Sequence, residues 1–236
     1  MGSKRFKNLD CAYCVEQKSV AGDHIFAREF FLPVDRDQLP QAPVCARCNN
    51  EKSKLEHYLT AILPFAGRHN QSCETLSELV PKRLSRNQAL HRELQEGLMY
   101  VNLNEGGVTS KTIALPIREG TIESLFGYIV RGLSWYHWGT YINPDNEIEP
   151  LILTADGARF FKENFFSLRP GKHVLANIGK GTIIYEGVQG VDSPQISIWR
   201  FRFYGGMMLA GSSEASASSE IGVMSGPPEA IVSNPQ

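Results

Sequence analysis

Two close pairs of cysteines near the start of the chain could bind a metal ion. The first pair lies in "CAYC", Cys11 and Cys14, and the second lies in "CARC", Cys45 and Cys48. Structural zinc takes four ligands in a tetrahedron, and each C-x₂-C turn supplies two thiolates to one ion. This spacing therefore predicts a structural Zn²⁺ site, in preference to four unrelated buried cysteines. The fifth cysteine, Cys73, has no partner in the sequence and is expected to be a small buried side chain.

Polar residues between and directly after these pairs could carry out hydrolysis. "DHI" supplies Asp23 and His24, and "CNNEKS" supplies Asn49 immediately after the last cysteine of the pairs. Hydrolysis of a phosphodiester needs a base that activates water and a cation that neutralises charge on the phosphate. His24 suits the base, whereas the carboxylate of Asp23 and the amide oxygen of Asn49 suit Mg²⁺ or Mn²⁺. The alternatives are an ordinary hydrogen-bonded pair for Asp23 and His24, and a helix cap for Asn49.

A helix that begins near Asn49 would hold one side of this site. Apolar residues follow at the i, i+3, i+4, i+7 spacing of a buried helical stripe, at Leu55, Tyr58, Leu59 and Ile62. Asn49 and Lys52 fall on the opposite face, together with Ser53 and Glu56. That polar face is expected to turn toward the segment that carries Asp23 and His24.

The segments "CAYC", "DHI" and "CARCNNEKS" together resemble an HNH endonuclease module of the four-cysteine kind, over about residues 8–65. The resemblance implies a zinc-stapled ββα-metal fold in which Asp23 binds the catalytic cation and His24 is the base. It places Asn49 at the family position that follows the last cysteine. It also implies that Lys52 binds phosphate, for which the alternative is a solvated surface charge.

One position departs from the family pattern. The family has an asparagine five residues before the third cysteine, which holds the loop and orients the histidine, whereas this chain has Pro40 there. Gln41, Gln38 or Asp37 could substitute for that asparagine if the loop shifts its register. Without a substitute, the departure implies slow or absent catalysis.

The whole chain is predicted to be α+β, in four parts. We expect the HNH-like module at 1–65, a helical connector at 66–107, an α+β domain of unknown role at 108–210 and a disordered tail at 211–236. The connector has an amphipathic pattern interrupted by Pro81. The tail is poor in large apolar residues, so burial would not offset the entropy lost on ordering it.

The α+β domain should contain two helices and two β-rich runs. The first helix has an apolar stripe within 122–133, and the second follows Thr154, which suits an N-cap. The second β-rich run, 194–211, alternates as a half-buried strand with Ile196, Ile198, Phe201 and Phe203 on its apolar positions. The aromatic cluster "RGLSWYHWG" is expected to pack in the core, and base stacking is the alternative.

Bulk composition limits the partners. The net charge is −1, so no global basic field draws the chain to nucleic acid. The segment "MGSKRFKNLD" is polar, and no stretch approaches the roughly 18 apolar residues of a membrane span. We therefore expect a cytoplasmic protein with no membrane partner.

These observations and the resemblance lead to two functional expectations. The first is a metal-dependent endonuclease that hydrolyses DNA with structural Zn²⁺ and catalytic Mg²⁺ or Mn²⁺, as an effector in defence against foreign DNA. Because weak DNA binding follows from the near-neutral charge, a protein partner or oligomer is expected to supply targeting. The alternative is a catalytically weak or inactive zinc-stapled module that binds nucleic acid or protein.

Overall fold

The computed structural model describes residues 4–67, 69–105, 108–167, 171–207 and 220–231 of the 236-residue chain. Helices and antiparallel sheets are both present, so the chain belongs to the predicted α+β class. Within the described ranges, no helix is long and apolar enough to cross a membrane.

The N-terminal unit is a small hairpin followed by a long helix. Strand β1 (Ala21–His24) pairs antiparallel with β2 (Gln41–Val44), with His24 opposite Gln41. Helix α1 (Ala46–Ala66) begins as soon as β2 ends, and the Cys45 thiol accepts a hydrogen bond from the backbone N–H of Cys48 at its first turn. Short 3₁₀ turns at Lys4–Phe6, Arg28–Phe30 and Pro33–Asp35 complete this unit.

The start of α1 corrects one interpretation of Asn49. Because Cys45 is the N-cap and the helix already runs from Ala46, Asn49 lies inside the helix and does not cap it. The predicted apolar stripe is largely confirmed, since Tyr58, Leu59 and Ile62 are buried and Leu55 is partly buried against the same core.

Five antiparallel strands form the main sheet, in the order β5-β9-β8-β7-β6. Their bounds are β5 Glu147–Leu153, β6 Gly171–Ile178, β7 Ile183–Gly190, β8 Ser197–Phe203 and β9 Glu220–Gly226. The two expected β-rich runs correspond to β7 and β8. The buried face of β8 carries Trp199, Phe201 and Phe203, so the expectation that Ile198 shares a face with the two phenylalanines is wrong.

Strand β9 corrects the prediction of a disordered tail. It lies between β5 and β8, pairs with both, and buries Ile221 and Val223 completely. The tail is indeed short of large apolar residues, but a strand inside a sheet needs only a few, because its neighbours supply the backbone hydrogen bonds and the rest of the core. The tail segments 211–219 and 232–236 lie outside the described residues.

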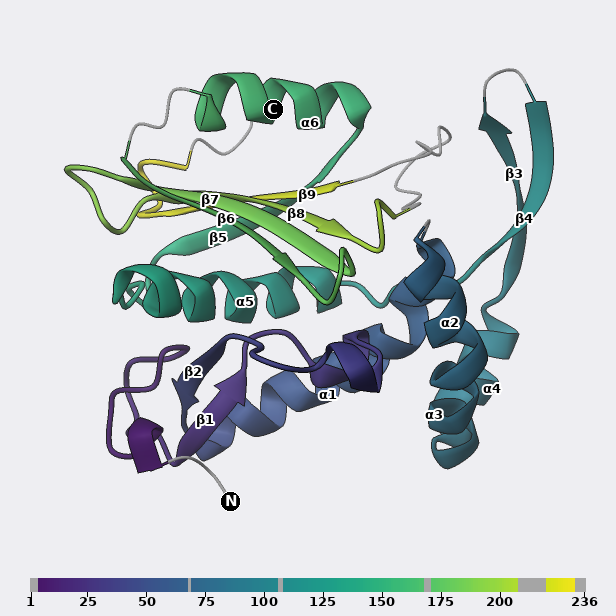
Figure 1. Ribbon diagram of the computed structural model, residues 1–236, viewed down its shortest axis with the longest axis horizontal. Coiled ribbons are helices and arrows are strands. Elements are labelled where there is room, and N and C mark those ends of the chain that lie inside the picture. The colour runs from purple at the N-terminus through teal and green to yellow at the C-terminus, as the bar shows by residue number, and fades with distance from the viewer. Residues whose placement is uncertain (1–3, 68, 106–107, 168–170, 208–219, 232–236) are drawn as a thin grey trace.

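Helices cover both faces of the main sheet, as Figure 1 shows. Helix α5 (Thr121–Trp138) lies between the sheet and the N-terminal unit, and α6 (Ala155–Phe161) lies on the other face, followed by a π-helical turn at Lys162–Phe166. The Thr154 hydroxyl caps α6 by accepting from the Gly157 N–H, as predicted.

The N-terminal unit and the sheet share one continuous hydrophobic core. Phe26, two residues after His24, packs against Tyr185, Phe201 and Phe203 of the sheet. Trp138 of α5 packs against Trp199 and Trp135 is partly buried, but Tyr136 is exposed, so the aromatic cluster packs in the core only in part. The hydrophobic core is therefore continuous across the domain boundary that was predicted after residue 65.

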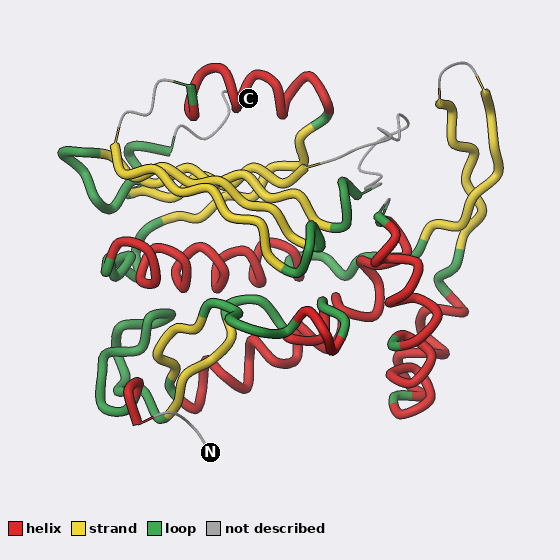
Figure 2. Tube along the Cα trace, viewed as in Figure 1, coloured by secondary structure: helices red, strands yellow, loops and turns green. Residues whose placement is uncertain are grey.

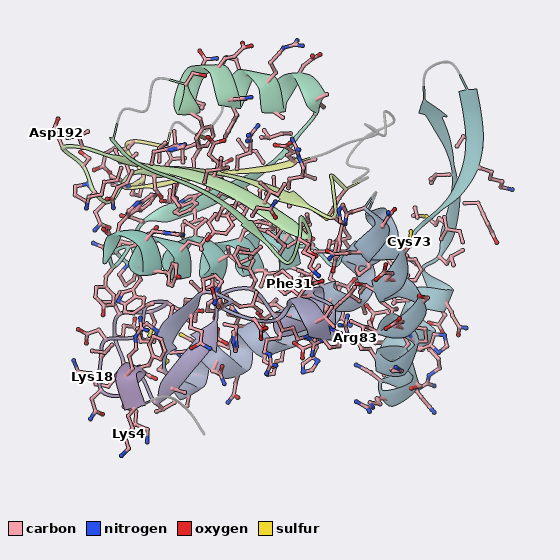
Figure 3. All side chains as sticks on the ribbon, viewed as in Figure 1. Lys4, Lys18, Phe31, Cys73, Arg83 and Asp192 are labelled. Carbon is pink, nitrogen blue, oxygen red and sulfur yellow. The ribbon has the colours of Figure 1, made fainter. Side chains whose placement is uncertain are left out.

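A helical arm and a second hairpin lie at one end of the molecule. The arm contains α2 (Asn70–Glu78), α3 (Val80–Arg86) and α4 (Gln88–Glu96), as expected for the connector. Strand β3 (Met99–Glu105) then pairs with β4 (Val108–Ala114), and Figure 2 shows this hairpin projecting from the body. The predicted boundary between 107 and 108 falls inside the hairpin. Cys73 on α2 is exposed and not buried as expected, and Figure 3 labels it on the arm.

Candidate functional site

The four paired cysteines come together as the sequence predicts. The sulfur atoms of Cys11, Cys14, Cys45 and Cys48 all lie within 4.8 Å of one another, and those of Cys14 and Cys45 are 3.9 Å apart. Four thiolates at about 2.3 Å from a tetrahedral zinc would lie about 3.8 Å from each other. The cluster therefore has the size and the ligand type to hold a structural zinc ion.

The surroundings of the cluster also suit thiolates. The Cys45 N–H donates to the Cys11 sulfur and the Cys48 N–H donates to the Cys45 sulfur, each over 3.4 Å. Burial raises the pKa of Cys48 and of Cys11, and the neighbouring sulfur charges add to this. These two thiols therefore hold their protons more tightly than a free cysteine does, and a bound Zn²⁺ would supply the charge that removes them.

A second cluster, the polar cluster, consists of Tyr13, Asp23, Lys52 and Glu56. The Lys52 side chain is only 1% exposed, and its ammonium lies 2.9 Å from Asp23 Oδ2 and also forms an ion pair with Glu56. It donates a further hydrogen bond of 2.8 Å to the backbone carbonyl of His24. The Tyr13 hydroxyl donates to the same Asp23 oxygen over 2.8 Å. Lys52 therefore joins α1 to the end of β1.

The two carboxylates of the polar cluster compete for one cation. Burial raises the pKa of Glu56 to about 7, while the Lys52 charge opposes the rise and the Asp23 charge adds to it. Burial also raises the pKa of Tyr13 well above its ordinary value, and the Asp23 charge reinforces this. Tyr13 is thus a neutral hydrogen-bond donor, and Glu56 can exchange a proton near neutral pH.

His24 lies half-buried at the end of β1, beside the polar cluster. Its Nε2 atom is 2.8 Å from the side-chain Nε2 of Gln41, its partner across the hairpin. Burial lowers the pKa of His24, the nearby Arg28 charge lowers it further, and the Asp23 charge opposes both. His24 is therefore neutral at physiological pH, which is the form a general base requires.

The contact with Gln41 bears on the missing family asparagine. Gln41, one of the three substitutes considered, directly contacts the ring of His24. If the amide donates to Nε2, the histidine proton lies on Nδ1, and if the amide is rotated so that its oxygen accepts, the lone pair lies on Nδ1. Only the second arrangement leaves a free lone pair, on Nδ1, that can accept a proton.

The remaining predicted residues lie on α1. Asn49 is exposed, one turn before Lys52 on the same face of the helix. Lys52 points inward and its ammonium is fully engaged, so in this conformation it is a structural cation of the site and not an exposed phosphate contact.

Sequence reasoning missed Tyr13, and it placed Glu56 on the polar face of α1 without naming a partner for it. Tyr13 lies between the first two cysteines, where the pattern alone marks it as a spacer. Glu56 stands four residues after Lys52, and this i, i+4 spacing was the only local signal that the two would pair.

Comparisons with known proteins identify no relative. No family model matches the chain, no curated protein matches it, and no solved structure matches it.

Proposed function

We propose that the chain is a metal-dependent endonuclease of the HNH type that hydrolyses phosphodiester bonds in DNA. The observation that carries the proposal is the position of His24. A neutral histidine lies beside a carboxylate, is contacted by an amide that selects its tautomer, and is carried on a hairpin joined to the cysteine cluster. A positioned base of this kind contributes roughly 10²–10⁴-fold to a rate.

In the proposed reaction, His24 accepts the proton of the attacking water. With the Gln41 amide oxygen accepting from Nε2–H, the lone pair lies on Nδ1 and takes this proton, and the Asp23 charge stabilises the imidazolium that forms. Lys52 keeps the Asp23 carboxylate in place through the ion pair and holds the end of β1 through the His24 carbonyl. These groups are pre-organised, so little reorganisation is needed in the transition state.

A hard divalent cation would be held by Asp23 and Asn49. Asp23 uses Oδ2 for Lys52 and Tyr13, and no described residue hydrogen-bonds to its Oδ1. A carboxylate oxygen and an amide oxygen are ligands that fit Mg²⁺ or Mn²⁺. When bound, the cation would neutralise negative charge on the phosphate and the leaving oxygen.

A plasmid-cleavage assay with Mg²⁺, with Mn²⁺ or with a chelator tests the proposal. Wild type should nick DNA only with a divalent cation, and His24→Ala should lose roughly 10²–10⁴-fold in rate. His57→Ala is the matched control, because His57 is an exposed histidine on α1 and should cleave like wild type. Equal cleavage by His24→Ala and wild type would refute the assignment of the base.

Asp23→Ala and Asn49→Ala separate a cation ligand from a base. Both should lose activity, but high Mn²⁺ should recover part of each loss, because a weakened site fills by mass action. His24→Ala should show no such recovery.

The second candidate is a zinc-stapled binding module without catalysis. It is favoured by one observation, the engagement of Asp23 Oδ2 by both Lys52 and Tyr13, which leaves the carboxylate less charge to offer a cation. Absence of cleavage with every divalent cation, combined with retained nucleic-acid or protein binding, would select this candidate. Targeting by a protein partner and a role in defence remain proposals that depend on the nuclease activity.

A further inference from the structure

The helical arm contains a short segment of concentrated positive charge. Residues 81–92, "PKRLSRNQALHR", contain four Lys and Arg residues and no Asp or Glu, in a chain whose net charge is −1. The segment spans α3 and the first half of α4. We call residues 81–92 the basic arm.

Three cations of the basic arm face solvent without compensation. Lys82, Arg86 and Arg92 are exposed, and none forms an ion pair with a described residue. Many exposed cations elsewhere are paired, including Lys18 with Asp10, Arg47 with Glu16 and Arg118 with Glu93. Exposed charges with no partner within the protein are free to bind an anion from solution.

The fourth cation, Arg83, connects the basic arm to α1 and to the segment that follows His24. Arg83 donates to the Thr60 carbonyl of α1 over 2.5 Å and also to the Glu29 carbonyl, five residues after His24. Figure 3 labels Arg83 where the arm meets the N-terminal unit. Arg28, next to Glu29, is exposed, and its charge acts on His24. Cations therefore extend from the side of His24 to the outer surface of α3.

We propose that the basic arm binds the phosphate backbone of double-stranded DNA and holds the duplex against His24. This inference rests on the proposed nuclease function and names the surface that its substrate uses. Lys82 and Arg86 stand at i and i+4, about 6 Å apart along the α3 axis. One DNA strand carries a phosphate for about every 3.4 Å of duplex axis, so two cations this close together can each contact a phosphate of the same strand.

Nearby acidic groups limit the strength of this binding. Glu29, Glu74 and Glu78 are exposed on the adjoining turn and on α2. Glu96, one turn after Arg92 on α4, is also exposed, so the expected affinity is modest and depends strongly on salt. Each phosphate contact contributes about −0.9 to the slope of log K against log salt concentration.

The test is the binding of a short labelled DNA duplex by the full chain, without added divalent cation, over a series of salt concentrations. The variant Lys82→Gln/Arg86→Gln/Arg92→Gln removes the three exposed cations. The control Arg159→Gln/Lys162→Gln/Lys172→Gln removes three exposed cations from α6, the π-helical turn and β6. Lys82→Gln/Arg86→Gln alone is a milder second variant. Thermal melting checks that each variant is folded.

The arm variant should bind at least about tenfold more weakly than wild type, with a salt slope shallower by about 2.7. The control should bind within about twofold of wild type. Equal binding by the arm variant and wild type, equal weakening by the control, or preference for single-stranded RNA would each overturn the proposal. If the protein cleaves DNA but the arm variant binds as well as wild type, only the DNA-binding role of the basic arm is refuted. If the protein binds DNA through the basic arm but does not cleave it, only the nuclease function is refuted.

Discussion

The cysteine cluster and the polar cluster lie at successive turns of α1, yet they are built differently. The cysteine cluster uses one kind of ligand from two short turns and adjoins the first turn of the helix. The polar cluster combines a phenol, two carboxylates and an ammonium, and it adjoins the second and third turns. The first can be satisfied by a single ion, whereas the second holds two acids and one base that cannot all be charged at no cost.

The two clusters therefore differ in whether their groups could take part in a reaction. A closed set of four thiolates around one ion would leave no open coordination position, so its role would be to stabilise the fold. The polar cluster leaves Glu56 with a pKa of about 7 and places His24, in its neutral form, beside it. Groups that titrate near neutral pH are the ones that can move protons under physiological conditions.

The largest effect should follow loss of one cysteine ligand. Cys45→Ser should unfold the N-terminal unit, because a structural zinc contributes on the order of 10 kcal/mol to apparent folding free energy. The core is shared, so the sheet should lose its thermal transition as well. Circular dichroism and elemental analysis measure this, with Cys73→Ser as the exposed control. Less than about half a zinc per folded wild-type chain would contradict the assignment of a zinc site.

Removal of the cation from the polar cluster should have the next largest effect. Lys52→Met leaves the mostly buried carboxylates of Asp23 and Glu56 without their cation, and breaking such a pair typically costs about 3–5 kcal/mol. Denaturant unfolding measures the change in free energy of unfolding. Lys54→Met is the control, because Lys54 is exposed on the same helix and should change stability by less than about 0.5 kcal/mol. Similar results for the two variants would mean that Lys52 is not needed to hold the cluster.

The pH dependence of stability should report on Glu56. Its folded-state pKa of about 7 lies above the ordinary value of 4.5, so its contribution is complete below pH 4.5 and is lost as the pH rises through 7. Glu56→Gln should remove that loss. Between about pH 5 and pH 8 the variant should gain up to about 3 kcal/mol on wild type, at 1.36 kcal/mol for each pK unit. Parallel stability curves for the two proteins would show that the carboxyl titrates normally.

The smallest effect should follow substitution of a glycine on α5 that faces Ile25 and Tyr13. A Cβ atom at Gly132 of α5 would lie 3.0 Å from Ile25 and 3.1 Å from Tyr13, whereas at Gly127 the nearest atom is 4.0 Å away. Overpacking costs about 1–3 kcal/mol, and replacing a helical glycine gains up to about 1 kcal/mol. Gly132→Ala should therefore destabilise by about 1 kcal/mol and Gly127→Ala should stabilise. Melting temperatures measure both changes, and shifts of the same sign in the two variants would contradict this prediction.

The cysteine cluster could be predicted from sequence because each ligand pair is local. Two residues separate the cysteines of each turn, and only the meeting of the turns depends on the fold. The stripe on α1, the cap at Thr154 and the helix at α5 were predictable for the same reason. Each rests on contacts within one turn or one helix.

The polar cluster and the sheet order could not be predicted in this way. Gln41 reaches His24 only because the hairpin register places them opposite each other, and a shift of one residue would turn the side chains to the other face. The partners of Lys52 come from both β1 and α1, so its inward direction depends on how the hairpin packs on the helix. Strand β9 is recognised only through its neighbours, since most of its stability is supplied by β5 and β8.

The central place of β9 has a consequence for synthesis of the protein. Among the described strands β9 is made last, yet it joins β5 to the other three strands. While the chain is still growing, β5 and β8 therefore each present an unpaired edge that can capture another nascent chain. A ribosome that stops before residue 220 would release a polypeptide with two such edges and a core lacking Ile221 and Val223. We therefore expect this truncated species to aggregate or to be degraded, and not to act as a shortened but functional protein.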